Sequence, residues 1–69
     1  MKTPCGIDLK IGQKWKELDR RFLSRIVEVI DWDDATQKVQ IKRGRTTWAK
    51  LSRFNGKNGG YELYSEAQP

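Results

Sequence analysis

Turn-forming residues divide this chain into segments, most of them short enough to be single strands. The dividers are Gly12, the acidic stretch DDAT at 33–36, RGR at 43–45 and the glycine-rich NGKNGG at 55–60. Clusters of Gly, Asp and Asn are typical of tight connections, because these residues accept turn dihedrals and hydrogen-bond to nearby backbone amides. Such punctuation favours a β meander or a small barrel over a helical bundle.

The segments between the turns carry strand patterns. IDLKIG at 7–12 alternates apolar and polar residues, and QKVQIKR at 37–43 places Val39 and Ile41 on one face. This alternation is the signature of a half-buried strand. Residues 21–32 form the longest apolar run, and its β-branched centre favours a strand. Because both of its faces carry apolar side chains, we expect this strand to be central in the sheet or bent by a bulge.

These patterns predict an all-β fold: a small five-stranded antiparallel SH3-like barrel, in which closure hides the sheet edges. An open twisted antiparallel sheet is the alternative. The expected strands lie near 7–16, 22–32, 37–43, 46–53 and 60–64, with 12–21 extended and ending in a loop at 17–21. The expected core consists of Val27, Val29, Val39, Ile41, Ala49, Leu51 and Leu63.

A chain of 69 residues makes one domain, and this one must be held together by its core. Cys5 is its single cysteine and histidine is absent, so neither a disulfide nor a structural zinc is available. We predict a flexible N-terminus at 1–6, a single β domain at 7–64 and a frayed C-terminus at 65–69. Without a signal-like or membrane-length apolar run, a cytoplasmic protein with no membrane partner is expected.

The sequence offers little for catalysis. The usual general base, histidine, is absent, and no base lies near Cys5 to make it a thiolate. NGKNGG lacks the following Ser or Thr of a phosphate-binding loop. The acids Asp31, Asp33 and Asp34 favour a turn over a divalent-cation site. We therefore predict a protein that is not an enzyme and uses no cofactor and no metal.

The charged residues at 17–21 are interpreted as surface salt bridges. Glu17 and Asp19 lie beside Arg20 and Arg21. Acids and arginines at such short spacing are expected to form salt bridges on the surface.

The net charge of +5 arises entirely from one stretch of the chain. Residues 1–34 hold seven cations and seven acids, residues 35–57 hold seven cations and no acid, and residues 58–69 hold two acids. This asymmetry indicates an anionic partner. The alternative is a basic hairpin that serves only to keep the protein soluble.

Trp48 lies within this basic stretch, and its orientation decides how the stretch is interpreted. Side-chain alternation along 46–54 places Trp48 with Lys50 and Ser52, and it places Ala49 and Leu51 on the opposite face. We predict that Trp48 points outward; the alternative is a core Trp48 with Lys50 at the rim.

An outward aromatic residue among cations is suited to nucleic acid, because the cations neutralise phosphates and the ring stacks on a base. The predicted function is a small non-catalytic binding module with weak, sequence-tolerant nucleic-acid binding through this basic hairpin. The predicted nucleic-acid-binding residues are Lys38, Lys42, Arg43, Arg45, Trp48 and Lys50. No small-molecule substrate is evident, and we expect a monomer or a weak dimer.

An exposed tryptophan beside arginine is also typical of protein interfaces. The alternative function is therefore protein–protein interaction, or a structural accessory role in a protein of phage or prophage origin.

Four spaced stretches, IGQKWKELDRR, RIVEVIDW, RTTWAKLSRF and GYELY, resemble a family of short, mostly uncharacterised bacterial and phage-associated proteins. Its pattern reads G-x-x-W-x-x-x-D-x-R, then R-F, then G-Y-x-L, and the resemblance covers about residues 11–64. The matching positions are Gly12, Trp15, Asp19, Arg21, Arg53, Phe54, Gly60, Tyr61 and Leu63. The resemblance implies an SH3-like barrel and brings no catalytic residues. In that pattern the position of Trp48 is usually polar, which favours the outward orientation.

Overall fold

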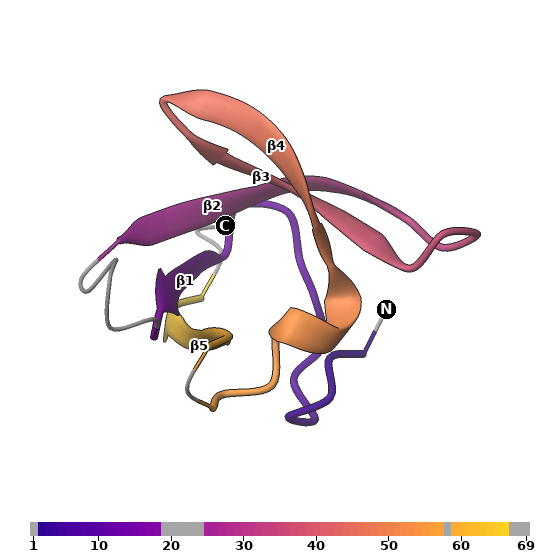
Figure 1. Cartoon of the computed structure of the whole chain (residues 1–69), viewed down its shortest axis with the longest axis horizontal. Coiled ribbons are helices and arrows are strands. Elements are labelled where there is room, and N and C mark those ends of the chain that lie inside the picture. Colours follow the sequence, from indigo (N-terminus) through magenta and orange to yellow (C-terminus); the bar gives the residue numbers. More distant parts are fainter. Residues whose placement is uncertain (1, 19–24, 58, 67–69) are drawn as a thin grey trace.

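In the computed structural model, which describes residues 2–18, 25–57 and 59–66, the chain forms one sheet (Figure 1). Its strands are β1 (Lys14–Glu17), β2 (Ile26–Asp33), β3 (Lys38–Arg43), β4 (Arg45–Lys50) and β5 (Tyr61–Ser65), and the 3-10 turn η2 (Leu51–Arg53) follows β4. The sheet order is β4-β3-β2-β1-β5, and each neighbouring pair is antiparallel. The prediction of an all-β, five-stranded antiparallel fold is confirmed.

The predicted closure into a barrel is wrong, and the open alternative holds. The two outer strands are β4 and β5, and no pairing joins them in the described part of the chain (Figure 1). After Lys50 the chain leaves the sheet in η2, and β5 then pairs with β1 instead of β4. Gly56 and Gly59 have positive φ and turn the chain along this route.

The central strand β2 has both features expected of it. It lies between β1 and β3, third of the five strands. Val29 pairs with Ile41 and Asp31 pairs with Gln40, so Ile30 is an extra residue where the register shifts. Such a bulge bends the strand and increases its twist.

Several strand limits differ from the prediction. Residues 7–12 do not belong to β1, because a turn at 11–12 intervenes, with Gly12 at φ +94°. Instead, Asp8 forms an isolated bridge with Lys2. The fourth strand ends at Lys50, where η2 begins. Residues 19–24, which include much of the predicted loop at 17–21 and the start of the predicted strand at 22–32, lie outside the described residues.

The N-terminal residues lie against the domain. Thr3 is buried, and its backbone amide donates a hydrogen bond to the Ile7 carbonyl. The Gly6 amide donates to the Thr3 carbonyl, and the Cys5 thiol donates to the Phe54 carbonyl at 3.3 Å. Residues 2–6 thus form a compact loop next to the end of η2, and the flexibility expected of residues 1–6 stays a prediction.

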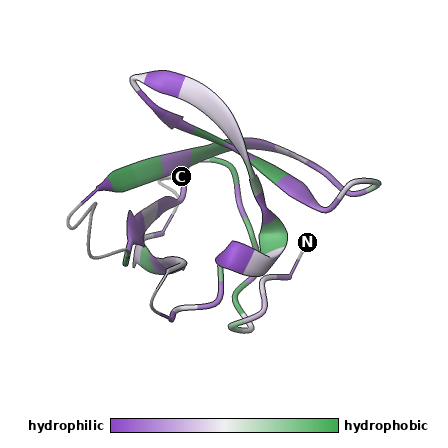
Figure 2. Ribbon diagram, viewed as in Figure 1, coloured by the Kyte–Doolittle hydropathy of each residue, from purple (hydrophilic) through white to green (hydrophobic). Residues whose placement is uncertain are grey.

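The core lies on the inner face of the bent sheet. Its buried apolar residues are Leu9, Trp15, Val27, Val29, Val39, Ile41, Ala49, Phe54 and Tyr61. The predicted core is confirmed for its three valines, Ile41 and Ala49, whereas Leu51 and Leu63 are only partly buried against the cluster. Figure 2 shows hydrophobic stretches along β2 that alternate with hydrophilic ones, as expected of the central strand.

A buried glutamine joins separate parts of the chain. The Gln13 side chain is fully buried, and its Oε1 accepts hydrogen bonds from the Lys10 amide at 3.1 Å and from Trp15 Nε1 at 3.2 Å. Its Nε2 donates to the Asp8 carbonyl at 3.0 Å and to Glu66 Oε2 at 3.1 Å. Gln13 therefore fixes the N-terminal segment and the end of β5 against the core.

Candidate nucleic-acid interface

The register of β3 and β4 sorts the side chains of this hairpin onto two faces. Three cross-strand pairs lie on the inner face with the core: Val39–Ala49, Ile41–Thr47 and Arg43–Arg45. The other three lie on the outer face: Lys38–Lys50, Gln40–Trp48 and Lys42–Thr46. The predicted binding residues therefore do not form one surface, because Arg43 and Arg45 lie on the inner side, away from the other four.

Trp48 points outward, as predicted. Its side chain is 50% exposed in the middle of β4, an edge strand of the sheet. A depression of about 260 Å³ beside the indole is lined by Asp33, Thr36, Lys38 and Trp48. The ring thus has an accessible surface with a cation close to it.

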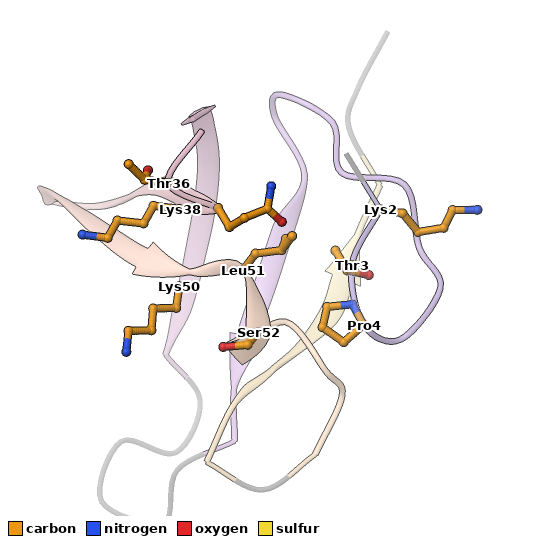
Figure 3. Close-up of a pocket in the computed structure, with 9 residues that line it drawn as sticks. Lys2, Thr3, Pro4, Thr36, Lys38, Lys50, Leu51 and Ser52 are labelled. Atoms are coloured by element: carbon orange, nitrogen blue, oxygen red, sulfur yellow. The ribbon is translucent and has the colours of Figure 1, made fainter. Parts of the chain in front are cut away.

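A second depression, of about 440 Å³, adjoins the first, since Thr36 and Lys38 line both. It lies between the hairpin and the N-terminal loop (Figure 3). Lys38 and Lys50 extend toward the same side of the view, whereas Lys2 extends toward the other side (Figure 3). The Lys2 ammonium also lies 3.9 Å from the Asp8 carboxylate. We call the two adjoining depressions the Trp48 groove.

Acids on β2 balance much of the charge on the outer face. Lys42 lies opposite Glu28 and Lys38 lies opposite Asp33 in the register of β2 and β3. Such opposite-charge pairs stabilise a sheet. On its other side Lys38 pairs with Lys50, on the edge strand β4. The outer face of the hairpin is therefore most positive at the Lys38–Lys50 pair, next to Trp48.

The turn predicted at Asp31, Asp33 and Asp34 is present: it spans residues 34–37, directly after Asp33 ends β2. Asp33 Oδ1 accepts a hydrogen bond from the Ala35 amide at 2.9 Å, and Asp31 Oδ1 accepts one from the Trp32 amide at 2.8 Å. Within residues 2–18, 25–57 and 59–66, no three Cys, Asp or Glu side chains come together as a metal site requires. The same residues contain no helix of the length and hydropathy needed to cross a membrane.

A third hollow, of about 470 Å³, lies on the inner side of the hairpin. We call it the arginine pocket. It is lined by Glu17, Arg25, Val27, Ile41, Arg43, Arg45, Thr47, Arg53 and Tyr61. Four cations thus converge there from the residue before β2, the tip of the β3–β4 hairpin and η2.

Glu17 lies at the base of this pocket and not on the surface, where a salt bridge with Arg20 or Arg21 was expected. It is only 6% exposed. Its Oε1 lies 3.5 Å from Arg53 Nη2 and its Oε2 lies 3.8 Å from Arg25 Nη1. The expectation of a surface residue is wrong because β1 places Glu17 on the inner face, alternating with exposed or half-buried lysines. Arg20 and Arg21 lie outside the described residues.

Tyr61 contributes a neutral wall to the arginine pocket. Its ring is buried, and the Arg53 guanidinium lies 4.9 Å from the ring centroid. Burial raises the pKa of the Tyr61 hydroxyl above its ordinary value, and the nearby Arg53 charge offsets part of this rise. The phenol is therefore uncharged near neutral pH. Among the described lining residues, four guanidinium groups face a single carboxylate.

The sequence did not predict that Arg25, Arg53 and Glu17 belong to one site. The position of Arg43 could have been predicted, because Arg43 is an even number of residues from Val39 and Ile41 along the same strand. Alternation alone therefore assigns Arg43 to the inner face. No local pattern links it to Glu17 or Arg25.

Comparisons with protein-family models, with curated proteins and with solved structures find no match for this chain. The resemblance described above stays a prediction, and the function is inferred from these surfaces.

Proposed function

We propose that the protein is a small non-catalytic module that binds single-stranded nucleic acid, weakly and with little sequence preference, at the Trp48 groove. The observation that carries this proposal is the half-exposed Trp48 beside the Lys38–Lys50 pair. A base stacks on the indole, and the two ammonium groups contact the neighbouring phosphates.

The short spacing between Trp48 and Lys50 on the edge strand β4 supports this function. Lys50 is two residues from Trp48 on the same face of β4, which is roughly 6.6–6.8 Å along the strand. A long lysine side chain at that spacing reaches a phosphate next to a stacked base. Lys42 lies on the same face but opposite Glu28, so it contributes at the margin of the site.

A protein partner is the alternative function, supported by the near balance of charges on the outer face. However, the two most exposed aromatic residues in the described part of the chain, Trp48 and Tyr64, lie on opposite edge strands, with β3, β2 and β1 between them in the sheet order. They therefore do not lie on adjacent strands. This pair does not form the single apolar patch that is typical of a protein-binding hot spot.

Replacing Trp48 by alanine is expected to weaken binding about 5- to 150-fold, since stacking of one base contributes roughly 1–3 kcal/mol. The plot of log K against log salt should keep its slope of roughly −1.5 to −2, because stacking releases no counterions. Lys50→Gln should instead make the slope shallower by about 0.7. Fluorescence anisotropy with a labelled single strand of about ten nucleotides, carrying a 5′-hydroxyl, measures both quantities.

Tyr64→Ala is the matched control, because Tyr64 is also an exposed aromatic residue but lies on β5. The affinity of the Tyr64→Ala variant for the single strand should stay within about twofold of that of the parent protein. Equal losses in Trp48→Ala and Tyr64→Ala, or the absence of saturable binding at low salt, would contradict the proposed function.

A further inference from the structure

The arginine pocket has an excess of positive charge that the fold does not neutralise. Arg25 and Arg53 flank Glu17, and Arg43 and Arg45 add two more cations, so the four arginines and one glutamate of the lining carry a formal charge of +3. The pocket lies on the inner side of the hairpin, whereas Trp48 is on the outer face. A ligand in the arginine pocket therefore binds independently of the Trp48 groove.

Arg43 and Arg45 are the two cations of the pocket that are open to a ligand. Within the described part of the chain neither forms an ion pair. They lie directly opposite each other across Gly44, whose φ of +71° makes the tight turn. Like charges directly opposite each other in a sheet are destabilising. An anion bound between the two guanidinium groups would remove this repulsion.

The deeper part of the pocket is held in place. Arg53 Nη2 donates to Glu17 Oε1 and also to the Gly59 carbonyl at 3.2 Å, and its guanidinium lies over the Tyr61 ring. The backbone of Arg53 also lies close to Gly60, and only glycine fits there, because a Cβ at that position would overlap the Arg53 carbonyl oxygen. The pocket thus has Arg53 held in place at its base and Arg43 and Arg45 at its rim. This arrangement is suited to binding an anionic group.

We propose that the arginine pocket binds a phosphate monoester group. The planar guanidinium fork matches phosphate oxygens in bidentate geometry, and a dianionic group neutralises most of the excess charge of +3. The volume of about 470 Å³ is within the range of sites for nucleotide-sized ligands. Such a phosphate belongs either to a small ligand such as a nucleoside monophosphate or to the phosphorylated end of a nucleic-acid strand.

Two double variants test this proposal with equal losses of charge. Arg43→Gln with Arg45→Gln should weaken binding of a nucleoside monophosphate at least tenfold, because both rim guanidinium groups are lost. Lys10→Gln with Lys14→Gln removes the same charge from two exposed lysines that line neither the arginine pocket nor the Trp48 groove, and should change the affinity less than about twofold. All four residues are exposed, so both variants are expected to fold. Chemical-shift titrations at constant ionic strength give the affinities.

The source of the phosphate is distinguished with two strands of the same sequence, one with a 5′-phosphate and one with a 5′-hydroxyl. If the phosphate belongs to a strand end, the phosphorylated strand binds more tightly, and this preference disappears in the double arginine variant. If it belongs to a small ligand, the nucleoside monophosphate binds the pocket and the strands show no preference. Either result supports the pocket.

The proposal is overturned if neither the nucleoside monophosphate nor the 5′-phosphate saturates the protein at about 10 mM, or if both double variants lose affinity equally. The 5′-hydroxyl strand reports separately on the Trp48 groove. Failure of the pocket therefore leaves the proposed function measurable, and failure of the proposed function leaves the pocket measurable.

Discussion

Replacing Phe54 by alanine is expected to lower the free energy of unfolding by about 3–5 kcal/mol. Phe54 has no exposed surface, and its ring packs edge-on against Trp15 at 5.1 Å and tilted against Tyr61 at 4.9 Å. It is the first residue after η2 and anchors the connection between β4 and β5 to the core. A small domain is stable by only about 5–15 kcal/mol, so this variant should lose a large part of its stability.

Urea unfolding followed by far-UV circular dichroism measures this loss. Tyr64→Ala is the control, because it also truncates an aromatic ring, and 63% of the Tyr64 surface is exposed. We expect its stability to stay within about 0.5 kcal/mol of the parent protein. A Phe54→Ala variant that loses less than about 1.5 kcal/mol would show that the aromatic cluster does not hold this fold together.

Replacing Gln13 by leucine is expected to cost about 2–3 kcal/mol, although leucine is of similar size and more hydrophobic. The exchange leaves Trp15 Nε1 and the Lys10 amide without the oxygen that accepts their hydrogen bonds, and Trp15 is fully buried. A buried donor left without a partner costs roughly 1–3 kcal/mol. In thermal unfolding this corresponds to a decrease in Tm of about 8–24 °C for a domain of this size.

Gln40→Leu provides the comparison for this exchange. Gln40 is on the outer face, opposite Trp48, and its side chain forms no hydrogen bond with any residue that the structure describes. Its Tm should change by less than about 4 °C. Equal changes for the two leucine variants would mean that the Gln13 hydrogen bonds contribute nothing net to stability.

The hairpin was the most predictable part of the molecule. Its two strands are joined by a single glycine, so the pairing is local and the alternation of side chains fixes both faces. The sequence therefore predicted correctly that Val39, Ile41 and Ala49 are buried and that Trp48 is exposed. The bulge in β2 was predictable for a similar reason, because a strand with apolar residues on both faces must be central or bent.

The open sheet could not be read from local patterns. Closure requires β4 to meet β5, and this depends on the twist of the whole sheet and on the path of the chain after Lys50. Likewise, the burial of Glu17 depends on Arg53, which is 36 residues away in the sequence, and Gln13 reaches Glu66 across 53 residues. Such contacts leave no periodic signal.

The charge of residues 35–57 indicated that many cations are present, but it did not predict on which surfaces of the fold they lie. Lys42 was expected to contribute to the positive surface, yet β2 places Glu28 opposite it. Arg43, its neighbour in sequence, points instead to the arginine pocket. Adjacent residues of a strand face opposite ways, so one basic stretch supplies two separate surfaces.

Binding of single-stranded nucleic acid at the Trp48 groove can be observed by titrating isotope-labelled protein with a 5′-hydroxyl oligonucleotide. Two-dimensional NMR spectra are recorded at low salt and at about 150 mM salt. We predict that the indole resonance of Trp48 and the amide resonances of Lys38 and Lys50 move at low salt and move less at the higher salt concentration. If these resonances stay in place at low salt, or if only residues around Tyr64 on β5 respond, the Trp48 groove does not bind nucleic acid.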